Sequence, residues 1–203
     1  ILLQQSLNSD RRTGEVSLMI YILKNALLLQ LAGFLLLAID FIPRFGWKKG
    51  TWFSLFHAVS AFGNAGFDLF GDSLVGFQQN PWVLSIISGL IISGGLGFLV
   101  WSDVLSYKRV RRISLHSKIA LIVTATLLIF GTLGFMLTEG NAASLAEGNV
   151  IHRFFNTIFM SVTPRTAGFF SVDYASMTHA GLLLTIILMF IGGTSGSTAG
   201  GFK

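Results

Sequence analysis

The chain has 203 residues, of which 52% are hydrophobic and only 11% are charged, with a mean hydropathy of +0.71. Soluble domains carry about 25% charged residues, so this composition excludes a water-soluble globule and favours the lipid bilayer as solvent. The net charge of +5 does not indicate a nucleic-acid partner, because five of the fourteen basic residues gather in one short loop between apolar stretches.

In chain order, apolar stretches of spanning length alternate with shorter ones. A helix that crosses a bilayer needs roughly 20 mostly apolar residues, whereas twelve helical residues reach only about 18 Å. The long stretches are Val16–Ile39, Pro81–Trp101, Lys118–Thr138 and Met177–Ile191, and the short ones are Thr51–Phe62 and Val150–Val162. We predict that the long stretches span the membrane. Each short one is expected to be a re-entrant half-helix, followed by an irregular segment that is buried in protein or lines a water-filled cavity.

A basic loop follows the second spanning stretch. It holds Lys108, Arg109, Arg111 and Arg112, with Lys118 at the start of the next helix, and only Asp103 opposes them. The loops on the other side have mixed signs. By the positive-inside rule the basic loop is expected to be cytoplasmic, so the segments after the half-helices open outward.

The order of elements repeats within the chain. At an offset of 102 residues, Asn64, Ala65, Gly66 and Phe67 align with Thr166, Ala167, Gly168 and Phe169. We interpret residues 16–112 and 113–203 as two consecutive helix–loop–helix pore repeats, and residues 1–15 as the end of a preceding repeat with its cytoplasmic loop. The chain begins at Ile1 rather than Met, and it supplies two loops where a pore needs about four. We therefore expect it to be part of a longer protein.

The two aligned loops suit a cation filter. Moving an ammonium-sized ion, similar in size to potassium, into a dry interior costs on the order of 20 kcal/mol, and a filter offsets this with backbone carbonyls. Gly66 and Gly168 tolerate the unusual backbone that such carbonyls require. The partly negative carboxyl end of each half-helix would also favour a cation. The alternative is that both glycines only cap the half-helices.

A glycine-rich run interrupts the last spanning stretch. It consists of Gly192, Gly193, Thr194, Ser195, Gly196, Ser197, Thr198, Ala199, Gly200 and Gly201. Each glycine costs about 1 kcal/mol relative to alanine in a helix, so we expect a broken helix that marks a permeation path or a moving part. A phosphate-binding P-loop is excluded, because Phe202 stands where that motif requires lysine. The four-residue spacing of the glycines leaves a helix-packing face as the alternative.

Two further features have structural interpretations. Ser93–Phe98 interrupts the second spanning stretch with three glycines, for which close helix packing is the favoured role. His57, on the first half-helix, is expected to be a hydrogen-bonded structural residue, because the histidines and carboxylates lack the spacing of a metal site. The absence of cysteine excludes disulfides and thiolate metal sites.

Four motifs together resemble the Trk/Ktr/HKT superfamily of potassium transporters, and most closely its bacterial KtrB subunits. They are FGNAGFD at Phe62–Asp68, SGGLGF at Ser93–Phe98, TPRTAGFFSVD at Thr163–Asp173 and FIGGTSGSTAGGFK at Phe190–Lys203. The resemblance implies an all-α integral membrane fold with helix–pore loop–helix repeats around a pseudo-fourfold pore. Phe202 departs from the pattern, since an aliphatic residue is commoner there.

The same resemblance implies a function and partners. The protein would take up potassium across the bacterial plasma membrane, with Gly66 and Gly168 in the filter and residues 192–201 as a gating loop beneath it. It would need no cofactor, would not be an enzyme, and would form a homodimer on cytosolic nucleotide-binding regulatory subunits of the RCK type. The alternatives are a sodium-selective or poorly selective cation transporter of the same fold, or a membrane scaffold whose glycines serve packing.

Overall fold

The computed structural model describes the backbone of residues 2–111, 113–140, 145, 149–194 and 196–201, and side chains from Met19 on, except those of residues 106 and 108–110. The regular elements of this part are helices, which confirms the expected all-α fold. They are α1 (Leu2–Phe45), α2 (Trp47–Phe62), α3 (Pro81–Val110), α4 (Leu115–Glu139), α5 (Val150–Val162) and α6 (His179–Phe190), with short 3-10 turns at Val75–Phe77 and Tyr174–Ser176.

Three segments are long and apolar enough to cross a membrane. They are Met19–Phe45, Pro81–Leu105 and Leu115–Glu139. The fourth expected span is different, because α6 has only 12 residues and the backbone leaves the helical conformation at Ile191. Twelve residues rise about 18 Å, so α6 alone is too short to cross the bilayer. The glycine-rich run that follows accounts for this early end.

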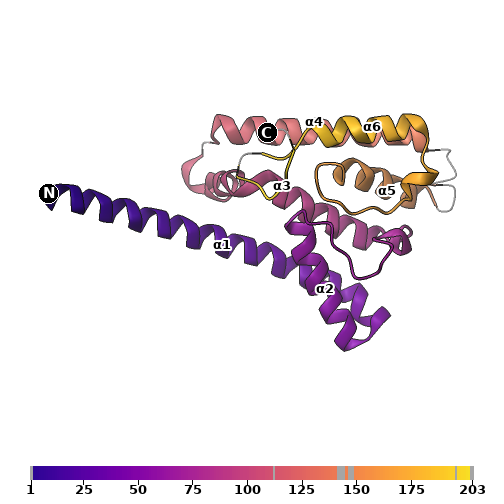
Figure 1. Ribbon diagram of the computed structural model, residues 1–203, viewed down its shortest axis with the longest axis horizontal. Coiled ribbons are helices and arrows are strands. Elements are labelled where there is room, and N and C mark those ends of the chain that lie inside the picture. Colours follow the sequence, from indigo (N-terminus) through magenta and orange to yellow (C-terminus); the bar gives the residue numbers. More distant parts are fainter. Residues whose placement is uncertain (1, 112, 141–144, 146–148, 195, 202–203) are drawn as a thin grey trace.

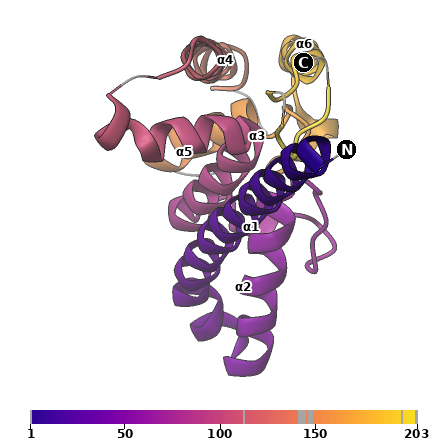
Figure 2. The ribbon, with the colours of Figure 1, turned by 90° about the vertical axis from the view of Figure 1, so that its left-hand side faces the viewer.

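The helices form two groups with the same internal order, α1–α2–α3 and α4–α5–α6 (Figure 1). Helix α2 folds back from the end of α1, and α6 runs alongside α4 above α5 (Figures 1 and 2). Glycines permit the closest contacts. A Cβ atom at Gly50 would lie 2.6 Å from the Phe41 carbonyl oxygen, and one at Gly134 would lie 2.5 Å from the Leu184 side chain. Glycines thereby let α2 pack tightly against α1, and α6 against α4.

Local capping fixes where the helices begin. The Asn80 side chain accepts a hydrogen bond from the Val83 N–H at 3.2 Å, and Pro81 occupies the first turn of α3. Ser114 caps α4 by accepting from the Ser117 N–H, and Thr178 caps α6 in the same way. These side chains satisfy backbone donors that the first helical turn leaves unpaired.

The main hydrophobic core lies where the two groups of helices meet, and it includes Phe41, Phe159 and Phe169. His57 of α2 is fully buried there, stacked on the ring of Phe70 at 4.4 Å between centroids. Its Nδ1 atom lies 2.7 Å from the Phe53 carbonyl oxygen and donates to it. The structural role expected for His57 agrees with this setting. Among the described residues, no cluster of three or more metal-ligating side chains occurs.

Candidate functional site

The two half-helices bring the aligned segments into contact. We call residues 64–67 the first re-entrant loop and residues 166–169 the second re-entrant loop. A Cβ atom built on Gly66 would lie 2.8 Å from both the Ala167 carbonyl oxygen and the Gly168 Cα atom. Helix α5 begins and ends at the predicted residues, whereas α2 begins four residues earlier than expected, at Trp47 instead of Thr51. Two segments 102 positions apart therefore form one site.

Both re-entrant loops have the same alternation of backbone conformation. Asn64 and Gly66 have positive φ angles of 48° and 71°, and Thr166 and Gly168 have φ angles of 67° and 80°. Alternating handedness allows successive carbonyls to face the same side, as a row of ion ligands requires. For a β-branched residue such as Thr166 this conformation costs about 1–3 kcal/mol. The helix-cap alternative is wrong, because Gly63 and Thr163 cap α2 and α5.

The carbonyl oxygens of the loops divide into two sets. Those of Phe67 and Phe169 accept hydrogen bonds from the hydroxyls of Ser60, at 2.8 Å, and Thr163. Within the part of the chain that the structure describes, the carbonyl oxygens of residues 64–66 and 166–168 accept no hydrogen bond. Backbone carbonyls that lack a protein partner are satisfied by water or by another ligand, so these six oxygens are open to water or a cation. The hydroxyls of Ser60 and Thr163, at the ends of α2 and α5, thus anchor the last residue of each loop.

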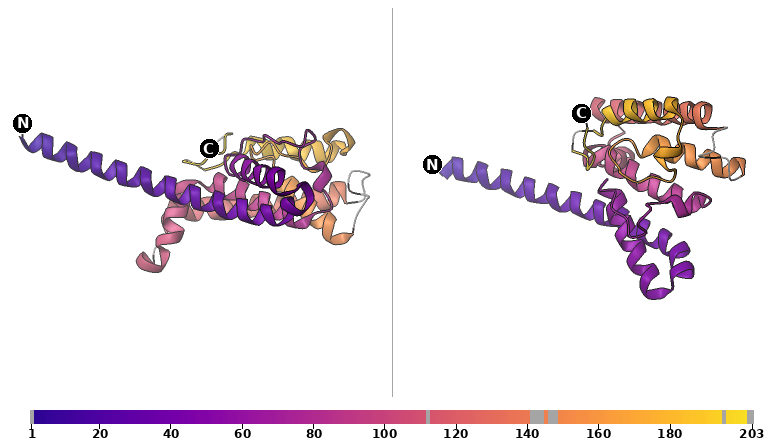
Figure 3. Two further views of the ribbon diagram at one scale, coloured as in Figure 1. Left: turned by 90° about the horizontal axis from the view of Figure 1, so that it is seen from below. Right: turned by 45° about the vertical axis from the view of Figure 1, so that its right-hand side comes forward.

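The glycine-rich run, residues 192–201, is hydrogen-bonded to both re-entrant loops, and we call it the glycine-rich loop. Its described parts, in yellow, lie beside the C-terminus (Figure 3). Thr198 Oγ1 donates to the Phe62 carbonyl oxygen at 2.9 Å and accepts from Asn64 Nδ2 at 2.8 Å. The Gly200 N–H donates to Thr166 Oγ1 at 2.9 Å. The loop therefore lies at the carboxyl end of α2. Ser195, which belongs to the predicted loop, lies outside the described residues.

Helix α3 holds the other side of the glycine-rich loop. The backbone of α3 is non-helical at Gly97, with φ 75° and ψ 167°. This kink frees carbonyl groups, so that the Thr194 N–H donates to Gly95 O at 3.1 Å and Thr194 Oγ1 donates to Leu96 O at 2.5 Å. A Cβ atom at Gly94 would lie 2.0 Å from the Phe62 carbonyl oxygen. Close packing was expected for Ser93–Phe98, but its partners are the glycine-rich loop and the end of α2.

The glycine-rich loop is itself a closed hairpin. The Gly193 N–H donates to Gly200 O at 3.2 Å, and a Cβ atom on Gly192 would lie 2.1 Å from that same oxygen. Because these residues are not helical, the alternative of a glycine face on a packed helix is wrong. The glycines allow the two arms of the hairpin to meet.

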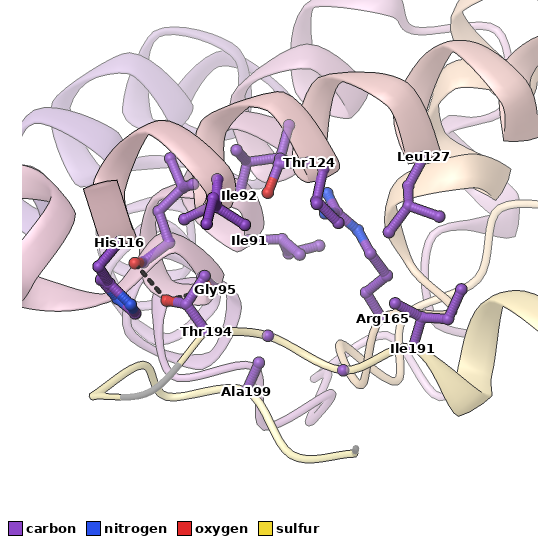
Figure 4. A pocket seen from close by; sticks show the side chains of 16 residues that line it. Ile91, Ile92, Gly95, His116, Thr124, Leu127, Arg165, Ile191, Thr194 and Ala199 are labelled. Atoms are coloured by element: carbon purple, nitrogen blue, oxygen red, sulfur yellow. Dashed lines mark hydrogen bonds between the residues drawn. The ribbon is translucent and has the colours of Figure 1, made fainter. Parts of the chain in front are cut away.

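Two cavities flank the glycine-rich loop. One of about 310 Å³ lies between α3, α4 and the loop, and the side chain of Arg165 enters it opposite Ala199 (Figure 4). The other, of about 130 Å³, is lined by α1, α3 and the loop residues Gly196 and Thr198. Among the described residues, Arg165 Nε is buried without a hydrogen-bond partner. The sequence analysis missed Arg165, although a charged residue in an apolar membrane segment is the usual signal of such a position.

Comparison with known proteins gives one family and several relatives. Residues 2–203 match TrkH, described as a cation transport protein family. The chain is 59% identical over 203 residues to the potassium/sodium uptake protein NtpJ of Enterococcus hirae, covering 100% of the chain and 45% of that protein. It is 39% identical over 204 residues to the Ktr system potassium uptake protein B of Bacillus subtilis, covering 100% of the chain and 46% of that protein. The chain thus spans less than half the length of these relatives.

A solved structure supports the fold. The potassium transporter TrkH from Vibrio parahaemolyticus superposes with a TM-score of 0.63 at 18% sequence identity, covering 94% of this chain and 38% of that one. At this identity the likeness concerns the arrangement of the helices. That arrangement agrees with the spans and half-helices described above.

Proposed function

The chain belongs to the TrkH family of cation transport proteins, and we propose that it supplies two filter segments and the gate of a potassium-uptake pore in the plasma membrane. The observation that carries the proposal is the contact between two re-entrant loops with the same left-handed positions, 102 residues apart. Six backbone carbonyl oxygens there have no hydrogen bond within the described residues. They are suited to replace the hydration shell of a potassium ion.

Electrostatics support a cation at this place. Helices α2 and α5 both end next to the re-entrant loops, and each helix carries a partial negative charge of about half an elementary charge at its carboxyl end. The scaffold alternative requires full-length helices in place of α2 and α5, which have only 16 and 13 residues. We assign the ion ligands to residues 64–66 and 166–168, and an anchoring role to Phe67 and Phe169.

The glycine-rich loop is proposed as the gate. Its hydrogen bonds to both re-entrant loops support this role, because in this position the loop would obstruct an ion that leaves the filter. A segment held by a few hydrogen bonds, with weak helical propensity, can be displaced at low cost. The two cavities beside it provide space for such a movement.

The first test replaces the filter glycines. Gly66→Ser and Gly168→Ser should each lower potassium uptake by the full-length protein at least about tenfold, because a side chain at positive φ is strained and meets the opposite loop. Potassium and sodium fluxes would be measured in liposomes. Gly76→Ser is the matched control, since a Cβ atom there has no neighbour within 4 Å. Normal potassium flux and ion preference in both filter variants would refute the assignment.

A sodium-transporting or poorly selective pore is the second candidate. The relative that is 59% identical is named a potassium/sodium uptake protein, which favours transport of both ions. The same liposome measurement separates the two candidates. Sodium flux in the wild type comparable to potassium flux would establish the second.

The full-length protein is also proposed to form a homodimer with cytosolic nucleotide-binding regulatory subunits of the RCK type. Two relatives are named as components of a Ktr system, which supports the presence of further subunits. The basic loop connects α3 to α4, and by the positive-inside rule it lies on the side where cytosolic subunits would bind.

A further inference from the structure

Two residues of the re-entrant loops combine a left-handed backbone with a hydrogen bond to the glycine-rich loop. They are Asn64, with φ 48°, and Thr166, with φ 67°, which occupy equivalent positions of the two loops. Asn64 Nδ2 donates to Thr198 Oγ1 at 2.8 Å, and Thr166 Oγ1 accepts from the Gly200 N–H at 2.9 Å. The two partners in the glycine-rich loop are themselves only two residues apart. Both re-entrant loops therefore have a left-handed residue whose side chain is hydrogen-bonded to the glycine-rich loop.

The conformations of these residues need external support. Gly66 and Gly168 adopt positive φ angles without a steric penalty, but Thr166 is β-branched and strained in that region. Strained backbone persists only where surrounding contacts hold it. The bond from Gly200 fixes the side chain of Thr166, and Thr198 fixes that of Asn64. Displacement of the glycine-rich loop would remove both restraints at once.

We infer that Asn64 and Thr166 are positioning residues through which the glycine-rich loop sets the shape of the filter, so that ion selectivity depends on the state of the gate. The inference rests on the proposed function and deepens it. Coupling between two sites is reciprocal, because any factor by which the loop changes ion affinity is also the factor by which the ion changes the loop. Potassium and sodium in the filter should therefore hold the glycine-rich loop closed to different extents.

The first experiment removes one restraint without changing side-chain shape. Thr166→Val in the full-length protein should lower the ratio of potassium to sodium flux in liposomes by about two- to tenfold, the value of one hydrogen bond. Thr166→Ser retains the acceptor for Gly200 and should preserve the ratio. Thr185→Val is the matched control, because that buried hydroxyl donates to Gly181 O within α6. An unchanged ratio in a folded Thr166→Val protein would overturn the inference.

The second experiment measures the reciprocal effect. Ser197→Cys places a reporter thiol in the glycine-rich loop at a hydroxyl that has no hydrogen-bond partner among the described residues. In nanodiscs, with the reporter as the sole cysteine, its labelling rate should differ about two- to tenfold between potassium and sodium, and Thr166→Val should reduce the difference. Equal rates in both ions without that substitution would overturn the coupling, even if Thr166→Val failed to fold.

The two proposals fail in different ways. If Gly66→Ser and Gly168→Ser abolish potassium uptake while Ser197→Cys is labelled at the same rate in both ions, the filter assignment is supported and the coupling is refuted. If neither glycine variant alters transport, the filter assignment itself is wrong. Wild-type uptake, measured in the same liposomes, is the reference for both glycine variants.

Discussion

Glu139 shows how a single buried side chain positions the helix that precedes the glycine-rich loop. It is fully buried at the end of α4, and its Oε1 atom accepts hydrogen bonds from the backbone N–H of Thr178, at 3.0 Å, and from the Thr178 hydroxyl. Thr178 is the N-cap of α6, so the carboxylate lies at the positive end of that helix dipole. Gly181 leaves room for it, because a Cβ atom there would lie 2.1 Å from Oε1. One carboxylate thus joins α4 to the helix that precedes the glycine-rich loop.

Glu139→Gln should lower the stability of the folded protein by about 1–2 kcal/mol, because it removes the charge at the start of α6 and weakens the bonds to Thr178. The measurement is thermal unfolding of purified full-length protein in detergent. Asp173→Asn is the control, since that exposed carboxylate also accepts from a backbone N–H but has no packed surroundings. A melting temperature that falls equally in both variants would show that the burial of Glu139 adds nothing to the stability of the folded protein.

The glycine-rich loop is built so that its ends meet. A Cβ atom on Gly201 would lie 2.7 Å from the Gly192 Cα atom, and the Gly193 N–H bonds to Gly200 O. Between these ends, Thr194 bonds to α3, and Thr198 bonds to α2 and the first re-entrant loop. The hairpin is thus held by polar contacts rather than by a hydrophobic core. Its removal leaves chain ends that are already adjacent.

Deletion of residues 193–200 should raise potassium flux in liposomes by on the order of tenfold, because it removes the obstruction and its hydrogen bonds while Gly192 and Gly201 can be rejoined. Size-exclusion chromatography would establish that the deletion protein is folded and assembled. A folded protein with unchanged or reduced flux would contradict the gate. By the coupling inferred above, the deletion should also lower the potassium-to-sodium ratio.

The two groups of helices, α1–α2–α3 and α4–α5–α6, pack asymmetrically around the re-entrant loops. Phe169, in the second re-entrant loop, is 1% exposed and lies beside His57 of α2, with 6.3 Å between ring centroids. Phe67, at the equivalent position of the first loop, is 69% exposed. The difference is expected if each re-entrant loop packs against the half-helix of the preceding repeat. Phe67 would then contact a further repeat of the full-length protein.

The orientation in the membrane can be tested with two substitutions. Arg111→Cys, in the basic loop, should resist a membrane-impermeant thiol reagent added outside intact cells, whereas Gly76→Cys, between the first re-entrant loop and α3, should react. A Cβ atom at Gly76 has no neighbour within 4 Å, so the cysteine fits there. The reverse labelling pattern would invert the proposed topology. Other cysteines of the full-length protein would be removed first.

The sequence by itself determined the features that depend on local composition and length. The bilayer requires about 20 apolar residues for a span, so Val150–Val162 was identifiable as a half-helix with the bounds that α5 has. Glycines destabilise helices wherever they cluster, so the break at residues 192–201 was also predictable, although its effect on the length of α6 was underestimated. The correspondence between the two re-entrant loops, 102 residues apart, could be identified by aligning the sequence with itself.

Only the tertiary structure decided which groups meet. The bonds from Thr198 to Phe62 and from Gly200 to Thr166 join residues 136 and 34 positions apart, and no local pattern specifies them. The same holds for the six carbonyl oxygens left without a hydrogen bond in the described part of the chain. A hydrogen bond depends on distances and angles between segments, which the fold fixes through the packing of α2, α3 and α5. Helix propensity and hydropathy depend on residues that are close in sequence, whereas the contacts between the re-entrant loops and the glycine-rich loop join residues that are distant in sequence.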